Sequence, residues 1–256
     1  MDSNRNYSAS EMMAVRASKE LHDKEVVFVG IGLPNVACNL ARETHAPSIE
    51  LIYESGAVGA RPERLPVSIG DPALVTGALG IVSQAEIFQN YLQGGRIQVG
   101  FLGGAQIDKY GNLNTTVIGD YNNPKVRLPG SGGACEIAVH AKRVLIVMRL
   151  SNKSFVEKCD FITSPGQKSL GKTRKEWGHE GGGPQVIITD KCVMTFDEAV
   201  GEFVVTEIYP DVTVEELKAA CGWDLKISSN PKAAEIPTEQ ELDLLRNKLD
   251  PQKLYL

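Results

Sequence analysis

The stretch Ile49-Glu50-Leu51-Ile52-Tyr53-Glu54-Ser55-Gly56-Ala57-Val58-Gly59 combines an apolar run, a carboxylate and a glycine turn. Residues 49–53 are typical of a buried strand, which we expect to end at Glu54. A carboxylate at the end of a buried strand costs free energy unless it is paired or used. Gly56 and Gly59 leave the backbone bare, so a ligand could approach the carboxylate closely. Glu54 is therefore a candidate functional residue, with a polar strand end facing solvent as the alternative.

The chain around this stretch predicts an α/β fold. Residues 25–29 are typical of a strand, Gly30-Ile31-Gly32 of a turn and residues 34–42 of a helix, in the order of a doubly wound unit. We expect an open, mostly parallel sheet with helices on both faces, and an antiparallel hairpin element in the C-terminal third. The other expected elements are the strands 96–102, 144–148, 186–189, 193–196 and 203–208 and the helices 8–21, 84–92, 135–139, 213–221 and 238–248.

Two polar segments look like surface features. Residues 167–183 are rich in Gly and Lys and predict a surface excursion, and the charge-rich last helix predicts a solvated element. Neither segment contains a clear linker, and the chain has no internal repeat. We therefore predict a single domain over residues 1–256.

Composition indicates an ordinary soluble globular protein, with 42% hydrophobic and 23% charged residues among 256. A net charge of −5 without a basic block argues against a nucleic-acid surface. Residues 1–6 contain no apolar signal region and no run reaches transmembrane length, so we expect a cytoplasmic protein away from the membrane. Five scattered cysteines are typical of buried thiols rather than of a disulfide framework or a zinc site: Cys38, Cys135, Cys159, Cys192 and Cys221.

Two glycine clusters follow predicted strands. Gly103-Gly104 ends the strand 96–102, and Gly130-Ser131-Gly132-Gly133 precedes a helix start at Cys135. Consecutive glycines before a helix leave backbone N–H groups that suit an anion or oxyanion, whereas a flexible linker is the alternative. Gln106 and Asn112 carry amides that could hold a carbonyl or carboxylate. Bracing of the loop is the alternative for both, and a left-handed turn position is a further one for Asn112.

Other chemistries fit the sequence less well. The turn Gly30-Ile31-Gly32 lacks the third glycine of a dinucleotide loop. The four histidines are isolated, which argues against a metal site. No Gly-x-Ser-x-Gly elbow of a serine hydrolase is present. A carboxylate with glycine N–H clusters and amides fits covalent catalysis at an acyl centre.

A family resemblance supports this reading. The run Glu54-Ser55-Gly56-Ala57-Val58-Gly59 resembles the glutamate signature of the family I CoA-transferases. Four further motifs resemble the β subunit of glutaconate CoA-transferase most closely, and they extend the match over nearly the whole chain. They are GGAQIDKYGNLN at 103–114, IGDY at 118–121, GSGGA at 130–134 and ITSPG at 162–166.

The resemblance implies the open α/β sheet of CoA-transferases and ribose-phosphate isomerase-like proteins. It implies that Glu54 attacks an acyl-CoA thioester and carries CoA as a glutamyl thioester in a ping-pong cycle. The N–H groups of Gly132 and Gly133 would stabilise the oxyanion, and Gln106 would lie near the reacting carbonyl. The CoA thioester would be a substrate, and no cofactor or metal would be bound permanently. Further substrate contacts are expected at Ser55, Gly56, Gly103, Gly104 and Arg61.

One departure from the family pattern concerns the substrate. Ala60-Arg61-Pro62 stands where many members have a further glycine, so we expect a reshaped acyl pocket and a small dicarboxylic or 3-oxo acid. Arg61 or Arg64 would meet a distal carboxylate, because guanidinium recognises carboxylates bidentately. A solvated loop arginine is the alternative.

The resemblance also implies a partner, because this chain holds one copy of the fold. We expect a CoA-transferase α subunit in a hetero-oligomer, α2β2 or larger. The competing functions are an acyl-CoA hydrolase or decarboxylase on the same scaffold, and a non-catalytic ligand-binding subunit.

Overall fold

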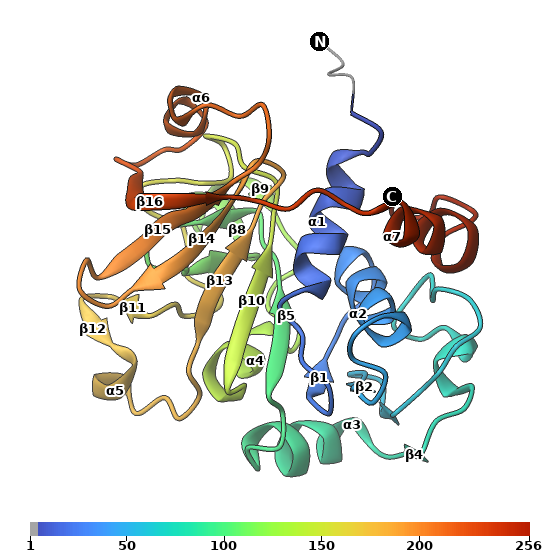
Figure 1. Ribbon diagram of the computed structural model, residues 1–256. Coiled ribbons are helices and arrows are strands. Elements are labelled where there is room, and N and C mark those ends of the chain that lie inside the picture. Colours follow the sequence, from blue (N-terminus) through green and yellow to red (C-terminus); the bar gives the residue numbers. More distant parts are fainter. Residues whose placement is uncertain (1–4) are drawn as a thin grey trace. The chain divides into compact units, whose positions relative to one another are not determined.

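The computed structural model describes residues 5–256 and divides them into two compact units (Figure 1). The first unit comprises the residues up to Phe101 together with Glu235–Leu256, and the second comprises Leu102–Ala234. The single domain expected from the sequence stays a prediction. The expected lack of an apolar signal falls mostly on residues 1–4, which lie outside the described residues.

The strands of the first unit form a mixed sheet in the order β5-β1-β2-β3-β4. Val27 pairs in parallel with Leu51 on one side and Val99 on the other, and all three are almost fully buried. The next two pairings, β2 with β3 and β3 with β4, are antiparallel. The strands are β1 (Val26–Phe28), β2 (Glu50–Ile52), β3 (Ala57–Val58), β4 (Gly80–Ile81) and β5 (Val99–Leu102).

The helices of this unit begin at the signals expected from the sequence. Ser8 and Glu11 form the predicted capping box of α1, and Gly32 precedes α2 with a φ of 87°. α1 packs against α2, as Figure 1 shows. The helical segments are α1 (Ala9–Ser18), α2 (Leu33–Glu43), η1 (Pro72–Val75), α3 (Gln84–Glu86), the π-helical η2 (Ile87–Gln93), α7 (Glu239–Asp243) and the π-helical η3 (Leu244–Leu249).

The last helix is exposed on its charged face, as expected, but its other face packs against the rest of the first unit. Leu245 is fully buried and belongs to the hydrophobic cluster that contains Val15 and Leu40. Arg246 forms an ion pair with the buried Glu11 at 2.6 Å. The prediction missed the buried face, because the leucines lie on one side of a segment whose composition is otherwise charged.

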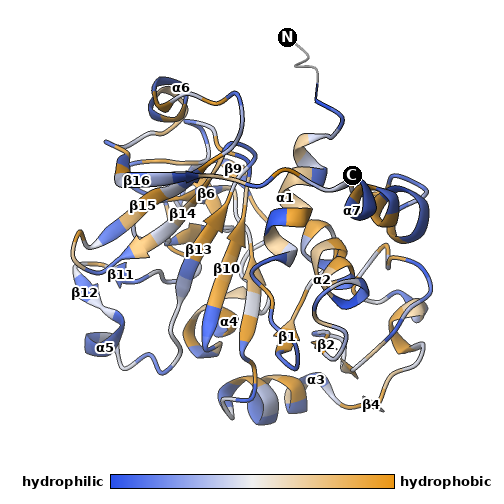
Figure 2. Ribbon diagram, viewed as in Figure 1, coloured by the Kyte–Doolittle hydropathy of each residue, from blue (hydrophilic) through white to orange (hydrophobic). Residues whose placement is uncertain are grey.

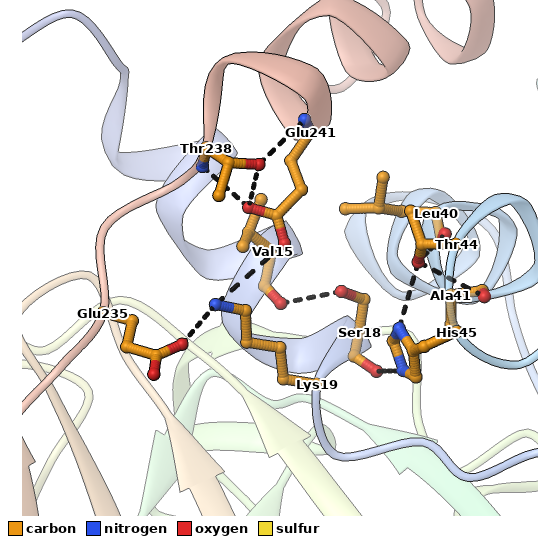
Figure 3. A network of polar contacts seen from close by, with 10 residues as sticks. All are labelled: Val15, Ser18, Lys19, Leu40, Ala41, Thr44, His45, Glu235, Thr238 and Glu241. Carbon is orange, nitrogen blue, oxygen red and sulfur yellow. Dashed lines mark hydrogen bonds and ion pairs between the residues drawn. The ribbon is translucent and has the colours of Figure 1, made fainter.

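Polar contacts tie the C-terminal end of α1 to the C-terminal segment and to His45 (Figure 3). Lys19 forms an ion pair with Glu235 at 2.9 Å and lies 4.0 Å from Glu241. The His45 ring lies 3.1 Å from the Ser18 carbonyl oxygen through Nε2. A ring N–H at that position adds a second donor to the Ser18 carbonyl, which also accepts from the Leu21 N–H at 3.0 Å. This histidine therefore has a structural role.

The second unit contains the predicted antiparallel hairpin. Its larger sheet has the order β16-β15-β14-β13-β10, in which β13, β14 and β15 are successively antiparallel and β10 is parallel to β13. Figure 2 shows β10 and β13 coloured mostly as hydrophobic. These five strands are β10 (Arg143–Val147), β13 (Pro184–Ile188), β14 (Cys192–Asp197), β15 (Glu202–Ile208) and β16 (Lys226–Ala233). The expected α/β fold with an antiparallel C-terminal element is confirmed.

Shorter elements connect these strands. The short strands among them form three antiparallel pairs, β6 with β7, β8 with β9 and β11 with β12. They are β6 (Gln106–Ile107), β7 (Leu113–Asn114), β8 (Val117–Gly119), β9 (Pro124–Arg127), β11 (Lys168–Ser169), β12 (Lys172–Thr173), α4 (Ala134–His140), α5 (Arg174–Trp177) and α6 (Val214–Ala219). Among the described residues, no helix is both long and apolar enough to cross a membrane.

The strand β16 was not expected from the sequence. It pairs in parallel with β15 at the edge of the sheet. It contains Pro231 and is largely exposed, so neither alternation nor an apolar run marks it. Proline is tolerated at the edge of a sheet because the N–H that it lacks has no strand to face there.

The segment 167–183 is largely exposed, as expected of a surface excursion, and Arg174 anchors it. Arg174 is only 7% exposed, and its guanidinium donates to the carbonyls of Gly181 at 2.9 Å and Gly166 at 3.2 Å. It also donates to the carbonyls of Ala138 and Val139, in the last turn of α4, at 2.8 and 3.0 Å. Burial lowers the pKa of Arg174 to about 10, so the side chain stays charged at neutral pH.

Replacing this arginine tests the anchor. Arg174→Met removes the donors of four backbone carbonyls, and buried groups left without a partner each cost about 1–3 kcal/mol. We expect the melting temperature of the full chain to fall by roughly 5–10 °C. The exposed neighbour provides the control: Lys175→Met should change the melting temperature by less than about 2 °C. Equal melting temperatures for the two variants would contradict the anchoring role.

Candidate active site

Glu54 lies in the tight turn that joins β2 to β3. The Gly56 N–H donates to the Tyr53 carbonyl at 2.9 Å, and the Tyr53 N–H donates to the Ala57 carbonyl at 2.9 Å. The Glu54 residue is half-buried. Within residues 5–256, its carboxylate makes no hydrogen bond or ion pair, whereas the carboxylates of Asp71 and Glu11 have partners. The turn therefore presents an unengaged carboxylate to a ligand.

The glycines of this turn make room for the protein's own backbone. Gly56 has a φ of 110°, and a Cβ at this position would lie 2.0 Å from the Val82 carbonyl oxygen. Its carbonyl also accepts from the Val82 N–H at 3.0 Å. Gly59 has a φ of 65°, and its Cβ would lie 2.7 Å from a methyl group of Leu79. The space on the Cβ side of these glycines is filled by the 79–82 segment, so on that side the backbone is not bare.

The two residues that follow Glu54 have different surroundings. Both backbone groups of Gly56 make hydrogen bonds within the protein, which gives this residue a structural role, and the predicted substrate contact of Gly56 stays a prediction. Ser55 is exposed, and its hydroxyl has no hydrogen-bond partner in the described part of the chain. Ser55 therefore remains available to a substrate.

A buried polar chain holds both arms of the hairpin against α2. The Tyr53 hydroxyl accepts a hydrogen bond from Asn35 Nδ2 at 2.7 Å, and both residues are fully buried. Asn39 Nδ2 donates to Asn35 Oδ1 at 2.9 Å. Arg42 donates to Asn39 Oδ1 at 3.2 Å and to the Ala60 carbonyl at 3.1 Å. Burial raises the pKa of Tyr53 to about 12, so its hydroxyl stays neutral.

The two arginines after the turn have different surroundings. Arg64 forms two hydrogen bonds with the Asp71 carboxylate, at 2.7 and 2.8 Å. Arg64 and two backbone N–H groups hold the pKa of Asp71 well below its usual range. Arg64 is therefore committed to Asp71 and is not free for the predicted contact with a distal carboxylate. Arg61 is exposed, has no ion pair among residues 5–256, and lines a cavity to which Glu54 does not contribute.

In the second unit, Gln106 is a buried brace. Its Oε1 accepts from Asn114 Nδ2 at 2.7 Å and from the Asp160 N–H at 3.0 Å. Its Nε2 donates to the Asp160 carboxylate at 3.1 Å. One N–H of the amide is left for another acceptor. The predicted position of Gln106 near a reacting carbonyl stays a prediction.

Asn114 was not identified from the sequence. It is fully buried, and its Oδ1 accepts from the N–H groups of Thr116 and Val117 at 2.9 and 3.2 Å. Asp160 was missed as well, and its carboxylate also accepts from the Gly119 N–H at 2.9 Å. The position of Asn114 at the end of the GGAQIDKYGNLN motif was the available signal.

The glycine-rich loop is tied to the same scaffold. The Gly130 N–H donates to the Thr115 carbonyl at 2.8 Å, and the Thr115 hydroxyl donates back to the Gly130 carbonyl at 2.8 Å. The N–H groups of Gly132 and Gly133 have no acceptor among the described residues. The structure therefore holds one end of the loop firmly and leaves two donors open at the start of α4.

Gly103 and Gly104 and the Asp108–Asn112 turn complete this region. A Cβ on Gly104 would lie 3.3 Å from the Asn114 carbonyl oxygen, which explains the glycine by close backbone packing. Asn112 donates to the Asp108 carboxylate at 2.9 Å and accepts from the Gly166 N–H at 2.8 Å, so it braces the loop. The left-handed position of the turn belongs to Gly111, with a φ of 79°, and not to Asn112.

Glu54 and Ser55 belong to the first unit, whereas the Gln106 scaffold and the glycine loop belong to the second. Across residues 5–256, no group of three His, Cys, Asp or Glu side chains is placed to hold a metal ion.

Known proteins resemble this chain over almost its full length. Residues 10–220 match the coenzyme A transferase family. The B subunit of 3-oxoadipate CoA-transferase from Pseudomonas knackmussii is 53% identical, over 94% of this chain and 92% of that protein. The B subunit of glutaconate CoA-transferase from Acidaminococcus fermentans is 35% identical, over 98% of this chain and 96% of that protein. The identity is thus higher to the 3-oxoadipate enzyme than to the glutaconate enzyme that the motifs resemble.

Solved structures share the fold. The crystal structure of glutaconate CoA-transferase from Acidaminococcus fermentans superposes with a TM-score of 0.90, covering 98% of this chain and 97% of that one. The decarboxylase AibA/AibB superposes with a TM-score of 0.83 at 20% identity over 96% of each chain, which shows the fold alone. The chain therefore belongs to the coenzyme A transferase family and is a CoA-transferase.

Proposed function

We propose that this chain is the catalytic subunit of an enzyme that moves CoA between an acyl-CoA and a small dicarboxylic or 3-oxo acid. The observation that carries the proposal is the unengaged carboxylate of Glu54 at the β2–β3 turn of a CoA-transferase. The 53% identity to a 3-oxoadipate CoA-transferase subunit supports an acid that is both dicarboxylic and 3-oxo.

The first half of the cycle transfers CoA to the protein. The Glu54 carboxylate attacks the thioester carbonyl and the C–S bond breaks. This step forms an acyl-glutamyl anhydride and releases CoA thiolate. The thiolate then attacks the glutamyl carbonyl and releases the first acid as a carboxylate. The second half runs the same steps in reverse with the acceptor acid and regenerates Glu54. No proton, electron or cofactor is consumed.

The proposal also includes donors for the oxyanion. The N–H groups of Gly132 and Gly133 are free to donate, and Gln106 has one N–H left. Preorganised backbone donors stabilise the charge that develops on the carbonyl oxygen. The bracing of Gln106 by Asn114 and Asp160 fits this role, because a fixed donor costs little reorganisation during the reaction. Contacts with the long CoA chain would supply binding energy that is used at the thioester.

The polar chain behind Glu54 supports precise positioning of the carboxylate. Tyr53 directly precedes Glu54 and is held by Asn35 at 2.7 Å. The other arm of the hairpin is held at the Ala60 carbonyl by Arg42. Holding both arms fixes the direction in which the turn presents its carboxylate, and such positioning is a large part of catalysis.

The names of the relatives support a two-subunit enzyme. Both the 3-oxoadipate and the glutaconate relative are named as B subunits, so we propose an α subunit as partner, in an α2β2 or larger assembly. A cytoplasmic location completes the proposal.

Two other functions use the same structure. Hydrolysis would follow if water attacked the acyl-enzyme bond in place of the acceptor acid, whereas decarboxylation would break a C–C bond of the bound acyl group and release CO2. A non-catalytic ligand-binding subunit would not need the carboxylate of Glu54. Measuring transfer and free CoA release in the same assay separates transfer from hydrolysis.

Removing the carboxylate tests the nucleophile. Glu54→Gln keeps the size of the side chain but cannot form the anhydride, so kcat/KM for transfer should fall by at least roughly a thousandfold in the reconstituted enzyme. Glu50→Gln is the control, because Glu50 is an exposed carboxylate on the same hairpin. Its kcat/KM should stay within about twofold. Full activity of Glu54→Gln would favour the non-catalytic reading.

Removing one hydroxyl tests positioning by the polar chain. Tyr53→Phe leaves Asn35 without its partner, so the turn loses one of its restraints. We expect kcat to fall roughly tenfold with KM nearly unchanged, because Tyr53 is buried and does not touch the substrate. Tyr121→Phe, at an exposed tyrosine, should leave both constants unchanged. If both variants kept the wild-type kcat at temperatures below their melting temperatures, the polar chain behind Glu54 would only stabilise the fold.

A further inference from the structure

A cationic cavity lies in the first unit, apart from the Glu54 turn. It has a volume of about 300 Å³ and is bounded by the C-terminal end of α2, the loop after Gly59 and the end of η3. This volume is at the lower end of the range for small-molecule sites. Its charged lining residues are Arg42, Arg61, Arg64, Lys248, Glu43 and Glu63.

Two of the four cations are already neutralised. Arg64 is paired with Asp71, and Lys248 is paired with Glu43. Arg42 and Arg61 have no carboxylate partner in the described part of the chain. The cavity therefore holds two guanidinium groups whose charge no ion pair compensates.

Arg42 is the more constrained of the two. Two of its N–H groups donate to Ala60 and Asn39, but its Nε is buried and has no hydrogen-bond partner among residues 5–256. Burial lowers the pKa of Arg42, and the nearby positive charge of Arg61 lowers it further. A buried donor without an acceptor is costly, and so are two like charges side by side. An anion held between the two guanidinium groups would offset the repulsion between their like charges.

The lining offers one competitor for that position. Glu63 is exposed, and its carboxylate makes no ion pair with the described residues. The charged groups of the cavity that form no ion pair are therefore Arg42, Arg61 and Glu63, and their net charge is +1.

We propose that this cavity binds a small oxyanion, a carboxylate or a phosphate, between Arg42 and Arg61. Guanidinium groups bind both classes through paired N–H···O bonds, which are stronger than neutral hydrogen bonds. The site is distinct from the acyl site of the proposed function, because Glu54 does not line the cavity. Arg42 would link it to the hairpin, since the same side chain holds the Ala60 carbonyl.

The test is calorimetric titration of the full chain with inorganic phosphate and, separately, with succinate, at constant ionic strength. We expect a single site for at least one of them. Arg61→Ala should raise its Kd by at least about tenfold, because one charge-assisted contact is lost. Glu63→Gln should lower the Kd, because it removes the competing carboxylate. Arg96→Ala is the control, since Arg96 lies over the Tyr91 ring outside the cavity and should leave the Kd unchanged.

The two titrants identify the source of the oxyanion. Binding of phosphate alone assigns the site to phosphate, and binding of succinate alone assigns it to carboxylates. Binding that Arg61→Ala and Arg96→Ala weaken equally, or no binding of either titrant, overturns the proposal. The same titrations with Glu54→Gln should give the wild-type Kd, which keeps this result independent of the proposed nucleophile.

Discussion

The carbonyl of Val82 occupies the space that any side chain at position 56 would need. A Cβ on Gly56 would lie 2.0 Å from that oxygen, and the Gly56 backbone conformation, with a φ of 110°, is one that only glycine adopts readily. This close approach places β4 beside β3 and closes the turn that carries Glu54. The carboxylate therefore stands at the tip of a rigid hairpin and not on a mobile loop. A nucleophile that must meet a thioester carbonyl at bonding distance gains from that rigidity.

The same requirement explains the polar groups that are buried nearby. Asn35, Asn39 and Arg42 project from α2 to hold Tyr53 and the Ala60 carbonyl, one on each arm of the hairpin. In the second unit, Asn114 and Asp160 hold Gln106, and Thr115 holds Gly130. Buried polar groups are costly unless each finds its partner, and among the described residues Arg42 Nε is the atom of these networks that has none. In each unit, buried hydrogen bonds therefore hold the segments that carry the family motifs.

Sequence patterns predicted the fold and the principal candidate, because these depend on local signals. The capping box at Ser8, the strand before Glu54 and the hairpin around residue 200 all stand where they were expected. The errors came from contacts between residues far apart in the chain. Arg174 reads as a surface residue until the carbonyls of α4 surround it, and Gly56 reads as an open site until Val82 fills it. The commitment of Arg64 to Asp71 and the bracing role of Asn114 likewise depend on tertiary geometry that no spacing reveals.

The proposed mechanism requires that CoA becomes covalently attached to Glu54. This attachment is tested most directly by incubating the reconstituted enzyme with an acyl-CoA, quenching in acid and examining the peptides by mass spectrometry. The mechanism predicts the mass of CoA, joined with loss of water, on the peptide that contains Glu54, and no such adduct when Glu54→Gln is treated in the same way. An unmodified Glu54 peptide from enzyme trapped during active transfer, or an adduct on a different residue, would contradict it.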